Sequence, residues 1–260
     1  MLDISNVTIA YKGTAAVKDF SLSMKSGQIV SIVGESGSGK TTVIRAVLGL
    51  MSSGGKITSG DIYFEGESIL NYSEEKWHKL RGSEISMIFQ DSGAMMNPIR
   101  TIGKVFIEYI LTHEKISRKE AWKKAVDMLE RMRLPDGENI MKSYPFQLSG
   151  GMRQRVGIAM GMTYKPKLLL ADEPTSALDV TTQAQIVRQM MQLRDEYGTG
   201  IILVTHNLGV AAYMSDYIIV MKDGKIEDEG TREYILGKSD NEYTKKLLKA
   251  VPSLRGERYV

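Results

Sequence analysis

A glycine-rich segment at residues 34–41 has the residue types needed to hold a triphosphate. It reads GESGSGKT and fits the pattern G-x-x-x-x-G-K-[ST], after an apolar run and before a helical pattern. Backbone N–H groups of such a turn can converge on phosphate oxygens because no Cβ blocks the approach, and the helix N-terminus adds a partial positive charge. Lys40 would place a full charge at the β- and γ-phosphates, and the Thr41 hydroxyl would ligate Mg²⁺. The residues predicted to contact nucleotide are Gly34, Glu35, Ser36, Gly37, Ser38, Gly39, Lys40, Thr41 and Thr42.

Two carboxylates follow an apolar run later in the chain. Residues 168–171 are Leu-Leu-Leu-Ala, and Asp172 and Glu173 come next. Asp172 is placed to hold Mg²⁺, as a Walker-B aspartate does, and Glu173 could orient and polarise a water for attack on the γ-phosphorus. A strand that simply exits into solvent would also carry acids. Together with the upstream phosphate loop, however, the pair favours a nucleotide-binding site, although the loop alone does not separate an ATPase from a kinase or a GTPase.

A second anion-binding helix terminus is predicted at residues 148–154, which read LSGGMRQ. Ser149, Gly150 and Gly151 lead into a helix predicted over 154–160. One chain does not need two such termini for one triphosphate. Two chains facing head to tail do, because each segment can cap the nucleotide held in the partner's phosphate loop.

In order along the chain, these motifs resemble those of the nucleotide-binding subunits of ATP-binding-cassette (ABC) transporters, over nearly the whole sequence. The resemblance implies that Tyr11 stacks on adenine, that Gln90 contacts Mg²⁺ and the attacking water, and that His206 reaches the γ-phosphate. Residues 176–179 match the loop that crosses to the partner, and Asp179 ends it. The implied cofactors are ATP and Mg²⁺. The implied catalytic residues are Glu173 as general base with Gln90 and His206, and the implied magnesium ligands are Thr41, Gln90 and Asp172.

Within the family, residues 144–147 (YPFQ) and 172–183 look like the oligopeptide, dipeptide and nickel importer branch, and Asn97-Pro98 agrees. Many peptide-importing members carry a C-terminal extension with clustered cysteines. This chain has 260 residues and no cysteine, which tilts the predicted cargo slightly towards nickel or a nickel chelate and away from short peptides. Asn207 stands where the branch usually has Asp, and residues 92–96 are an unusual stretch in the region expected to face the membrane subunit.

The elements that must position these residues alternate between strand and helix. Strands are predicted over 2–9, 20–24, 28–33 and 61–64, with a helix over 40–50. Residues 73–162 are mainly helical, with a strand at 85–89 and a capping box at Ser117 and Glu120. The alternation resumes with strands at 168–171, 201–205 and 218–222 and a helix at 182–197.

This pattern predicts an α/β fold: a P-loop NTPase (RecA-like) core with an N-terminal antiparallel β region and an inserted α-helical subdomain that carries residues 148–154, called the signature below. A single ABC nucleotide-binding domain is expected over 1–260. Its predicted parts are a β-subdomain plus P-loop core at 1–91 and 163–240, a helical subdomain at about 92–162, and a C-terminal tail at 241–260.

Composition excludes several other classes of protein. Lys and Arg number 34 against 31 Asp and Glu, and the resulting net charge of +3 does not imply a nucleic-acid partner. Without cysteine there is no disulfide, thiolate metal site or cysteine nucleophile. Residues 197–215 contain no Asp, Glu, Lys or Arg and are about as long as a membrane-spanning helix. Their glycines and polar residues, however, predict a strand, a loop and a helix instead of a membrane span. A soluble chain without a signal peptide is expected, and the 16 scattered methionines are expected in the core or at interfaces.

The resemblance implies a subunit at the cytoplasmic face of the cell membrane, with ATP closing a dimer and hydrolysis reopening it. Its expected partners are two transmembrane permease subunits, a second ATPase subunit that is identical or paralogous, and indirectly an extracytoplasmic substrate-binding protein. The alternative is an ABC ATPase of DNA repair or translation that moves no cargo. Repair members insert long coiled coils and translation factors usually hold two cassettes, whereas this chain has one cassette and a short insertion. A simple P-loop kinase has no use for residues 148–154.

Overall fold

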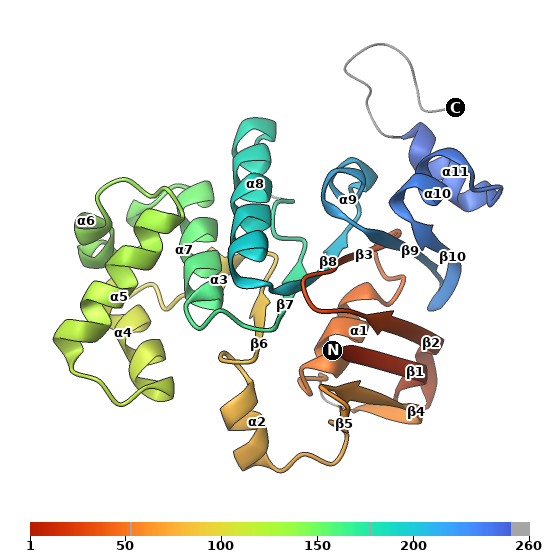
Figure 1. The fold of residues 1–260 in the computed structure, drawn as a ribbon, viewed down its shortest axis with the longest axis horizontal. Helices are drawn as coiled ribbons and strands as arrows, with labels where there is room; N and C mark the ends of the chain where they lie inside the picture. The colour runs from red at the N-terminus through yellow and green to blue at the C-terminus, as the bar shows by residue number, and fades with distance from the viewer. Residues whose placement is uncertain (53, 177, 251–260) are drawn as a thin grey trace. The chain divides into compact units, whose positions relative to one another are not determined.

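The computed structural model describes residues 1–52, 54–176 and 178–250, and the chain divides into two compact units (Figure 1). The first unit joins residues 1–78 to the chain from Gly200 onward, and the second is Lys79–Thr199. The predicted helical subdomain at 92–162 lies within the second unit, and its boundaries stay a prediction. Ala177 of the predicted crossing loop and residues 251–260 of the predicted tail lie outside the described residues.

The first unit contains a four-stranded antiparallel sheet in the order β2-β1-β4-β5. Apolar side chains of β1 alternate towards the core, and a register shift at Asn6 (φ +48°) keeps the later ones on the buried face. The sheet confirms the predicted N-terminal antiparallel region, although its strands are longer than predicted because the ladder continues through their polar ends. Its members are β1 (Leu2–Tyr11), β2 (Thr14–Met24), β4 (Gly55–Phe64) and β5 (Glu67–Ser68).

The first unit also contains parallel strands that set up one functional edge. β3 (Ile29–Val33) pairs in parallel with β8 (Gly200–Thr205) and with β9 (Tyr217–Lys222). β3 and β8 are buried throughout, which explains their unbroken apolar sequences. Because the strands are parallel and in register, their carboxyl ends meet at one edge, where ligands bind in open α/β sheets.

The described residues of the first unit also form the strand β10, four whole helices and the beginning of α2 (Glu74–Leu80). β10 (Lys225–Thr231) pairs antiparallel with β9 and was not predicted, since its sequence KIEDEGT is charged and half-exposed. The predicted helix at 40–50 ends early, because Gly49 takes a left-handed conformation (φ +63°) after the cap. The helices are α1 (Lys40–Val47), α9 (Leu208–Met214), α10 (Arg232–Gly237) and α11 (Glu242–Lys249).

The second unit packs helices around the parallel pair β6 (Ile85–Ile88) and β7 (Leu168–Asp172). The predicted capping box is confirmed: Ser117 Oγ accepts the N–H of Glu120, whose carboxylate accepts the N–H of Ser117. The signature helix begins at 150 and not at 154, because Ser149 caps it and both glycines enter its first turn. The helices are α3 (Ser92–Met95), α4 (Ile102–His113), α5 (Arg118–Arg131), α6 (Gly137–Lys142), α7 (Gly150–Met162) and α8 (Val180–Tyr197), with a 3₁₀ turn at Pro145–Gln147; α2 (Glu74–Leu80) spans the point where the units join.

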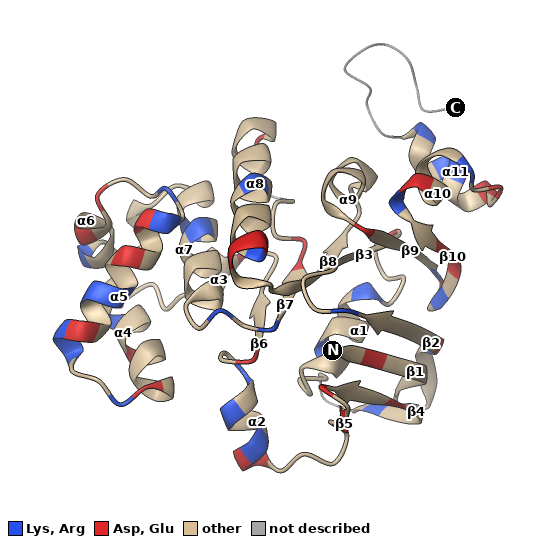
Figure 2. Ribbon diagram, viewed as in Figure 1, with Lys and Arg blue, Asp and Glu red and all other residues tan. Residues whose placement is uncertain are grey.

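Helix α5 of the second unit is densely charged and carries both acidic and basic residues, whereas α7 carries only basic ones (Figure 2). Within the described ranges, no helix combines the length and apolar character needed to cross a membrane. The uncharged stretch at 197–215 divides into the end of α8, the buried strand β8 and helix α9, as predicted.

Candidate nucleotide site

Steric crowding restricts which residue can stand where the glycine-rich loop leaves β3. Gly34 has φ +154°, and a Cβ at this position would lie 2.1 Å from the carbonyl oxygen of Met221 on β9. Gly39, with φ +100°, is the N-cap of α1. No side chain larger than hydrogen fits at Gly34, so the loop can begin only with glycine here.

Lys40 folds back over the loop that precedes it. Its side chain is buried, and Nζ donates to the carbonyl oxygens of Gly34 at 2.8 Å and Glu35 at 2.7 Å. A longer contact of 3.5 Å reaches Ser38 Oγ. The ammonium group is therefore held at the start of α1, where phosphate oxygens could take over from these neutral acceptors and form stronger, charge-assisted bonds.

The turn between β9 and β10 supports the middle of the loop. The N–H of Gly224 donates to the Ser38 carbonyl at 3.2 Å, and the Gly224 carbonyl accepts the N–H of Lys18 at 2.8 Å. The loop is thus tied to β2 and to the β9–β10 turn, both distant in sequence.

The C-terminal helix also contacts the loop. The hydroxyl of Tyr243 on α11 accepts the N–H of Glu35 at 3.2 Å, and Lys246 Nζ lies 3.9 Å from the Glu35 carboxylate. The Tyr243 ring is buried in a core cluster that contains Val33 and Val220, the strand residues beside the loop. Sequence reasoning missed this residue, since one tyrosine in a polar C-terminal segment gives no signal.

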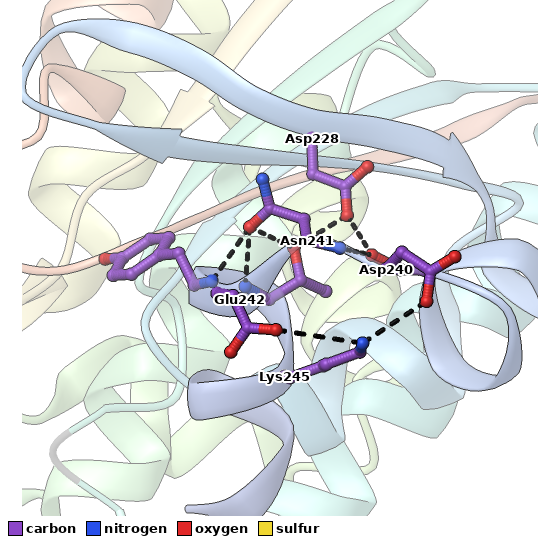
Figure 3. A network of polar contacts seen from close by, with 8 residues as sticks. Asp228, Asp240, Asn241, Glu242 and Lys245 are labelled. Atoms are coloured by element: carbon purple, nitrogen blue, oxygen red, sulfur yellow. Dashed lines mark hydrogen bonds and ion pairs between the residues drawn. The ribbon is translucent and has the colours of Figure 1, made fainter.

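A polar network fixes α11 against β10 (Figure 3). Asn241 caps the helix by accepting the N–H groups of Tyr243 at 2.9 Å and Thr244 at 3.0 Å, and its amide donates to the Glu227 carbonyl. The Asp228 carboxylate accepts the hydroxyls of Ser239 and Thr244. These bonds fix the start of α11 and so hold the Tyr243 hydroxyl beside the phosphate loop.

Replacing Tyr243 by Phe is expected to weaken ATP binding about threefold to tenfold, because the Glu35 N–H loses a partner worth about one hydrogen bond. Isothermal titration with ATP measures the change. Tyr234→Phe, the same substitution at a 40% exposed position on α10, serves as the control. Equal affinities in the two variants would show that Tyr243 only packs.

His206 and the phosphate loop leave the same edge of the first unit. Thr205 is in register with Val33, so the residues that follow them, His206 and Gly34, emerge side by side. Asn207 is the N-cap of α9 and accepts the N–H of Gly209 at 2.9 Å, a role that Asn and Asp fill equally well. Tyr11 is the last residue of β1, and its stacking on adenine stays a prediction.

In the second unit, the parallel strands bring Gln90 and Glu173 together. Ile88 of β6 is in register with Ala171 of β7, and Gln90 Nε2 donates to Glu173 Oε2 at 3.3 Å. Asp172 is buried at the end of β7, and Glu173 directly after it has φ +43°. This left-handed conformation is uncommon for a non-glycine residue, although several turn and bulge residues of this chain, such as Asn6, share it. The predicted catalytic glutamine and glutamate are thus neighbours in the fold, although 83 residues separate them in sequence.

The signature and the crossing loop each end at a helix N-terminus, and these two ends are in contact. Ser149 Oγ accepts the N–H of Met152 at 3.3 Å, and a Cβ on Gly151 would lie 2.6 Å from Thr182 Cγ2 on α8. Asp179 caps α8 by accepting the N–H of Thr182 at 2.9 Å, and this bond holds the pKa of the Asp179 carboxyl below its ordinary value. It stays a prediction that nucleotide in a partner's site contacts Gly150, Gly151 and Asp179.

Gln154 on α7 is a positioning residue that sequence reasoning did not single out. Its side chain is buried; Oε1 accepts the N–H of Ser92 at 3.3 Å and Nε2 donates to the Phe89 carbonyl at 3.4 Å. These bonds tie the signature helix to the backbone on both sides of Gln90. Gln154 stands between Arg153 and Arg155 in the sequence, so its burial gave no clear signal there.

The donor set suits magnesium bound together with a triphosphate. In the described parts of the chain, no group of three or more His, Cys, Asp or Glu side chains is arranged to hold a metal ion. Mg²⁺ usually takes one or two carboxylates and completes its shell with phosphate oxygens and water. Thr41 of the first unit offers a hydroxyl oxygen, and Gln90 and Asp172 of the second unit offer an amide oxygen and a carboxylate; these are donor types that Mg²⁺ bound to a nucleotide takes.

The chain matches a known protein family and several named proteins. The profile described as "ABC transporter" matches residues 17–176. The chain is 42% identical over 243 residues to the oligopeptide transport ATP-binding protein AppD of Bacillus subtilis, covering 93% of this chain and 74% of that protein. It is 40% identical to the oligopeptide transport ATP-binding protein OppD of Escherichia coli (99% and 77% covered) and to the dipeptide transport ATP-binding protein DppD of Lactococcus lactis subsp. cremoris (98% and 74%).

Solved structures agree with the fold. A dimeric ATP-binding cassette, MJ0796, bound to ADP and Pi in a post-hydrolysis state, aligns with a TM-score of 0.79 and 32% identity, covering 89% of this chain and 99% of that one. The cassette cbiO1 of Clostridium perfringens aligns with the same TM-score and 28% identity, covering 91% and 90%. These matches confirm the predicted α/β class with a P-loop NTPase core.

Proposed function

The chain belongs to the ABC transporter family and is an ATPase of that family, and from this premise we propose that it powers an importer of short peptides from the cytoplasmic face of the cell membrane. The role in peptide import is inferred from relatives whose names specify oligopeptide or dipeptide transport, and the observation that carries the ATP-hydrolysing part of the proposal is the pairing of Gln90 with Glu173 at the ends of β6 and β7. This pair supplies a candidate base and a group that orients it, which a domain that only binds nucleotide does not need.

Phosphoryl transfer asks a protein mainly for positioning and charge stabilisation. In the proposed reaction the loop amides and Lys40 hold the β- and γ-phosphates, and His206 contacts the γ-phosphate. Glu173 takes a proton from the attacking water, with Gln90 fixing its carboxylate. Bound Mg²⁺, held through Thr41, Gln90 and Asp172, would neutralise charge on the phosphate oxygens.

A head-to-tail dimer is the proposed working form. Ser149, Gly150, Gly151 and Asp179 would then contact the nucleotide of a second ATPase subunit, identical or paralogous. Val180, directly after Asp179, is an 81% exposed apolar side chain that such an interface would cover. The MJ0796 cassette is a dimer, which agrees with the proposal.

The Ser149→Arg variant tests action in trans. If the subunits form the head-to-tail dimer, a variant subunit will block the site of its wild-type partner. Adding excess variant will then suppress the ATPase rate of a fixed amount of wild type. Ser117→Arg, which removes another serine N-cap in the same unit, is the matched control and should not suppress it. An ATPase rate that depends only on the amount of wild type would exclude the head-to-tail dimer.

A hydrophobic cavity beside Gln90 is the proposed permease contact. It has a volume of about 190 Å³, and Met95, Met96, Val105 and Met160 contribute to its lining. Met95 and Ile99 are 63% and 81% exposed, as expected for apolar residues that a partner covers. This agrees with the expectation that residues 92–96 face the membrane subunit.

Co-purification from detergent-solubilised membranes tests the proposed function. The wild-type chain should bring down two permeases, and Met95→Glu should lose them while keeping its ATPase rate. Leu70→Glu, a similar change at an exposed leucine of the first unit, should retain them. Recovery of the wild-type chain without membrane proteins, or with DNA-repair or ribosomal proteins, would favour the non-transport alternative.

The cargo is proposed from the relatives, whose names specify oligopeptides or dipeptides. Nickel or a nickel chelate is the second candidate, because the sequence contains no cysteine. An extracytoplasmic binding protein would deliver the cargo to the permeases in either case. Uptake of a labelled dipeptide and of radioactive nickel, compared in cells with and without this gene product, separates the two cargoes.

A further inference from the structure

We propose that a pocket on the signature helix α7 and helix α8 of the second unit binds a compact polyanion. The pocket has a volume of about 530 Å³, within the range of small-molecule sites. Its walls are arginine and glutamine side chains: Arg133, Arg155, Arg188, Gln185, Gln189 and Gln192.

The pocket is built from three elements of the same unit. Gln185, Arg188, Gln189 and Gln192 stand at positions i, i+3, i+4 and i+7 of α8, so they share one face of that helix. Arg155 projects from α7, and Arg133 follows the end of α5. Basic segments are visible on both α7 and α8 in Figure 2.

No carboxylate pairs with the three arginines of this pocket in the described residues, although Arg133 and Arg188 are exposed to solvent. No carboxylate is among the six lining side chains. Across residues 1–52, 54–176 and 178–250, none of the three arginines forms an ion pair. Burial holds the pKa of the Arg155 guanidinium below its ordinary value, because the charged form is partly removed from water. A bound anion would offset the cost of burying the Arg155 charge and could pair with Arg133 and Arg188.

Two polar atoms of the lining residues are buried without a hydrogen-bond partner among the described residues. They are Arg155 Nε and Gln189 Oε1. Arg155 donates only to Gln185 Oε1, at 2.5 Å, and Gln189 donates to the Met132 carbonyl at 3.0 Å. Buried polar side-chain atoms are normally paired, so two exceptions in one pocket indicate groups that a ligand or its water completes.

Arg133 adopts a backbone conformation that glycine would take more easily. Its φ is +52°, directly after the cap of α5, where its N–H closes the helix on the Glu130 carbonyl at 2.8 Å. Glycine is the usual residue at this position of a helix end. The chain instead carries an arginine there, and its side chain lines the pocket.

The side chains define the ligand class. Guanidinium groups match phosphate and carboxylate oxygens with paired, charge-assisted hydrogen bonds, and glutamine amides add further donors. The ligand is therefore a small molecule with two or more negative charges on phosphate or carboxylate groups.

Occupancy of this pocket would act on the signature, a consequence that rests on the proposed function. α7 begins at Ser149 and α8 at Asp179, and Gly151 and Thr182 hold these two ends in contact. A ligand that joins Arg155 to Arg188 would couple the two helices whose N-termini are proposed to contact the partner's nucleotide.

Isothermal titration of the full chain, with the phosphate loop first saturated with ADP, tests the binding. Inorganic pyrophosphate is the phosphate probe and citrate the carboxylate probe. One probe should bind with a stoichiometry of about one, and Arg133→Gln and Arg188→Gln should each weaken it about tenfold, the loss typical of a charge-assisted bond. Arg118→Gln, at an exposed position in the first turn of α5, should leave it unchanged.

Thermal unfolding with and without the probe distinguishes a loss of binding from misfolding of a variant. At equal concentrations, the probe should raise the melting temperature of the ADP-loaded wild type and of Arg118→Gln by more than that of ADP-loaded Arg188→Gln. No binding of either probe to the wild type, or equal binding to all variants, would overturn the pocket. Because the titration needs no ATP turnover, an error in the proposed transport function would leave its result unchanged.

Discussion

The Glu173→Gln variant is expected to bind ATP like the wild type and to hydrolyse it about 100- to 10,000-fold more slowly, the usual range for losing a general base. The amide keeps the shape of the carboxylate and an oxygen that can still accept the bond from Gln90 Nε2. It cannot take a proton from water. Single-turnover hydrolysis and ATP titration measure the two effects, and size-exclusion chromatography should reveal an accumulating ATP-bound dimer.

Glu130→Gln is the control for this prediction, because Glu130 is an exposed glutamate of α5 in the same unit. Its turnover should equal that of the wild type. Turnover of Glu173→Gln near the wild-type rate would mean that the base is a different residue. Loss of ATP binding in that variant would instead assign Glu173 to nucleotide binding.

The Lys40→Ala variant is expected to lose ATP affinity by about 100-fold, because charge-assisted bonds to phosphate are removed from a buried position. The structure adds a second expectation. Lys40 Nζ also holds the carbonyls of Gly34 and Glu35, so the variant without nucleotide should melt at a lower temperature. Titration with ATP and thermal unfolding without nucleotide measure the two effects separately.

Lys25→Ala, at an exposed turn before β3, provides the matched control for Lys40→Ala. It should change neither the affinity for ATP nor the melting temperature. An ATP affinity of Lys40→Ala within threefold of the wild type would show that the loop amides bind phosphate without the ammonium group.

Features of the sequence that act locally were predicted well. The phosphate loop lies between β3 and α1, where the glycine pattern places it, and Ser117 and Glu120 form their capping box. Such features depend on side chains within a few residues of each other, so the sequence specifies them directly. Boundaries were less accurate where neighbours intervene: β10 was missed because a charged edge strand is held by pairing with β9, not by an apolar pattern of its own.

The sequence by itself therefore determined which residues can perform the chemistry, the α/β class and the family. The tertiary structure decided which of these residues meet. Gln90 reaches Glu173 because β6 and β7 pair in parallel, and Tyr243 reaches the loop because α11 packs into the core beside Val33. The pocket of Arg133, Arg155 and Arg188 likewise exists only once three helices are assembled. Long-range contacts of this kind depend on the packing of buried surfaces across the whole unit, which no short segment of sequence specifies.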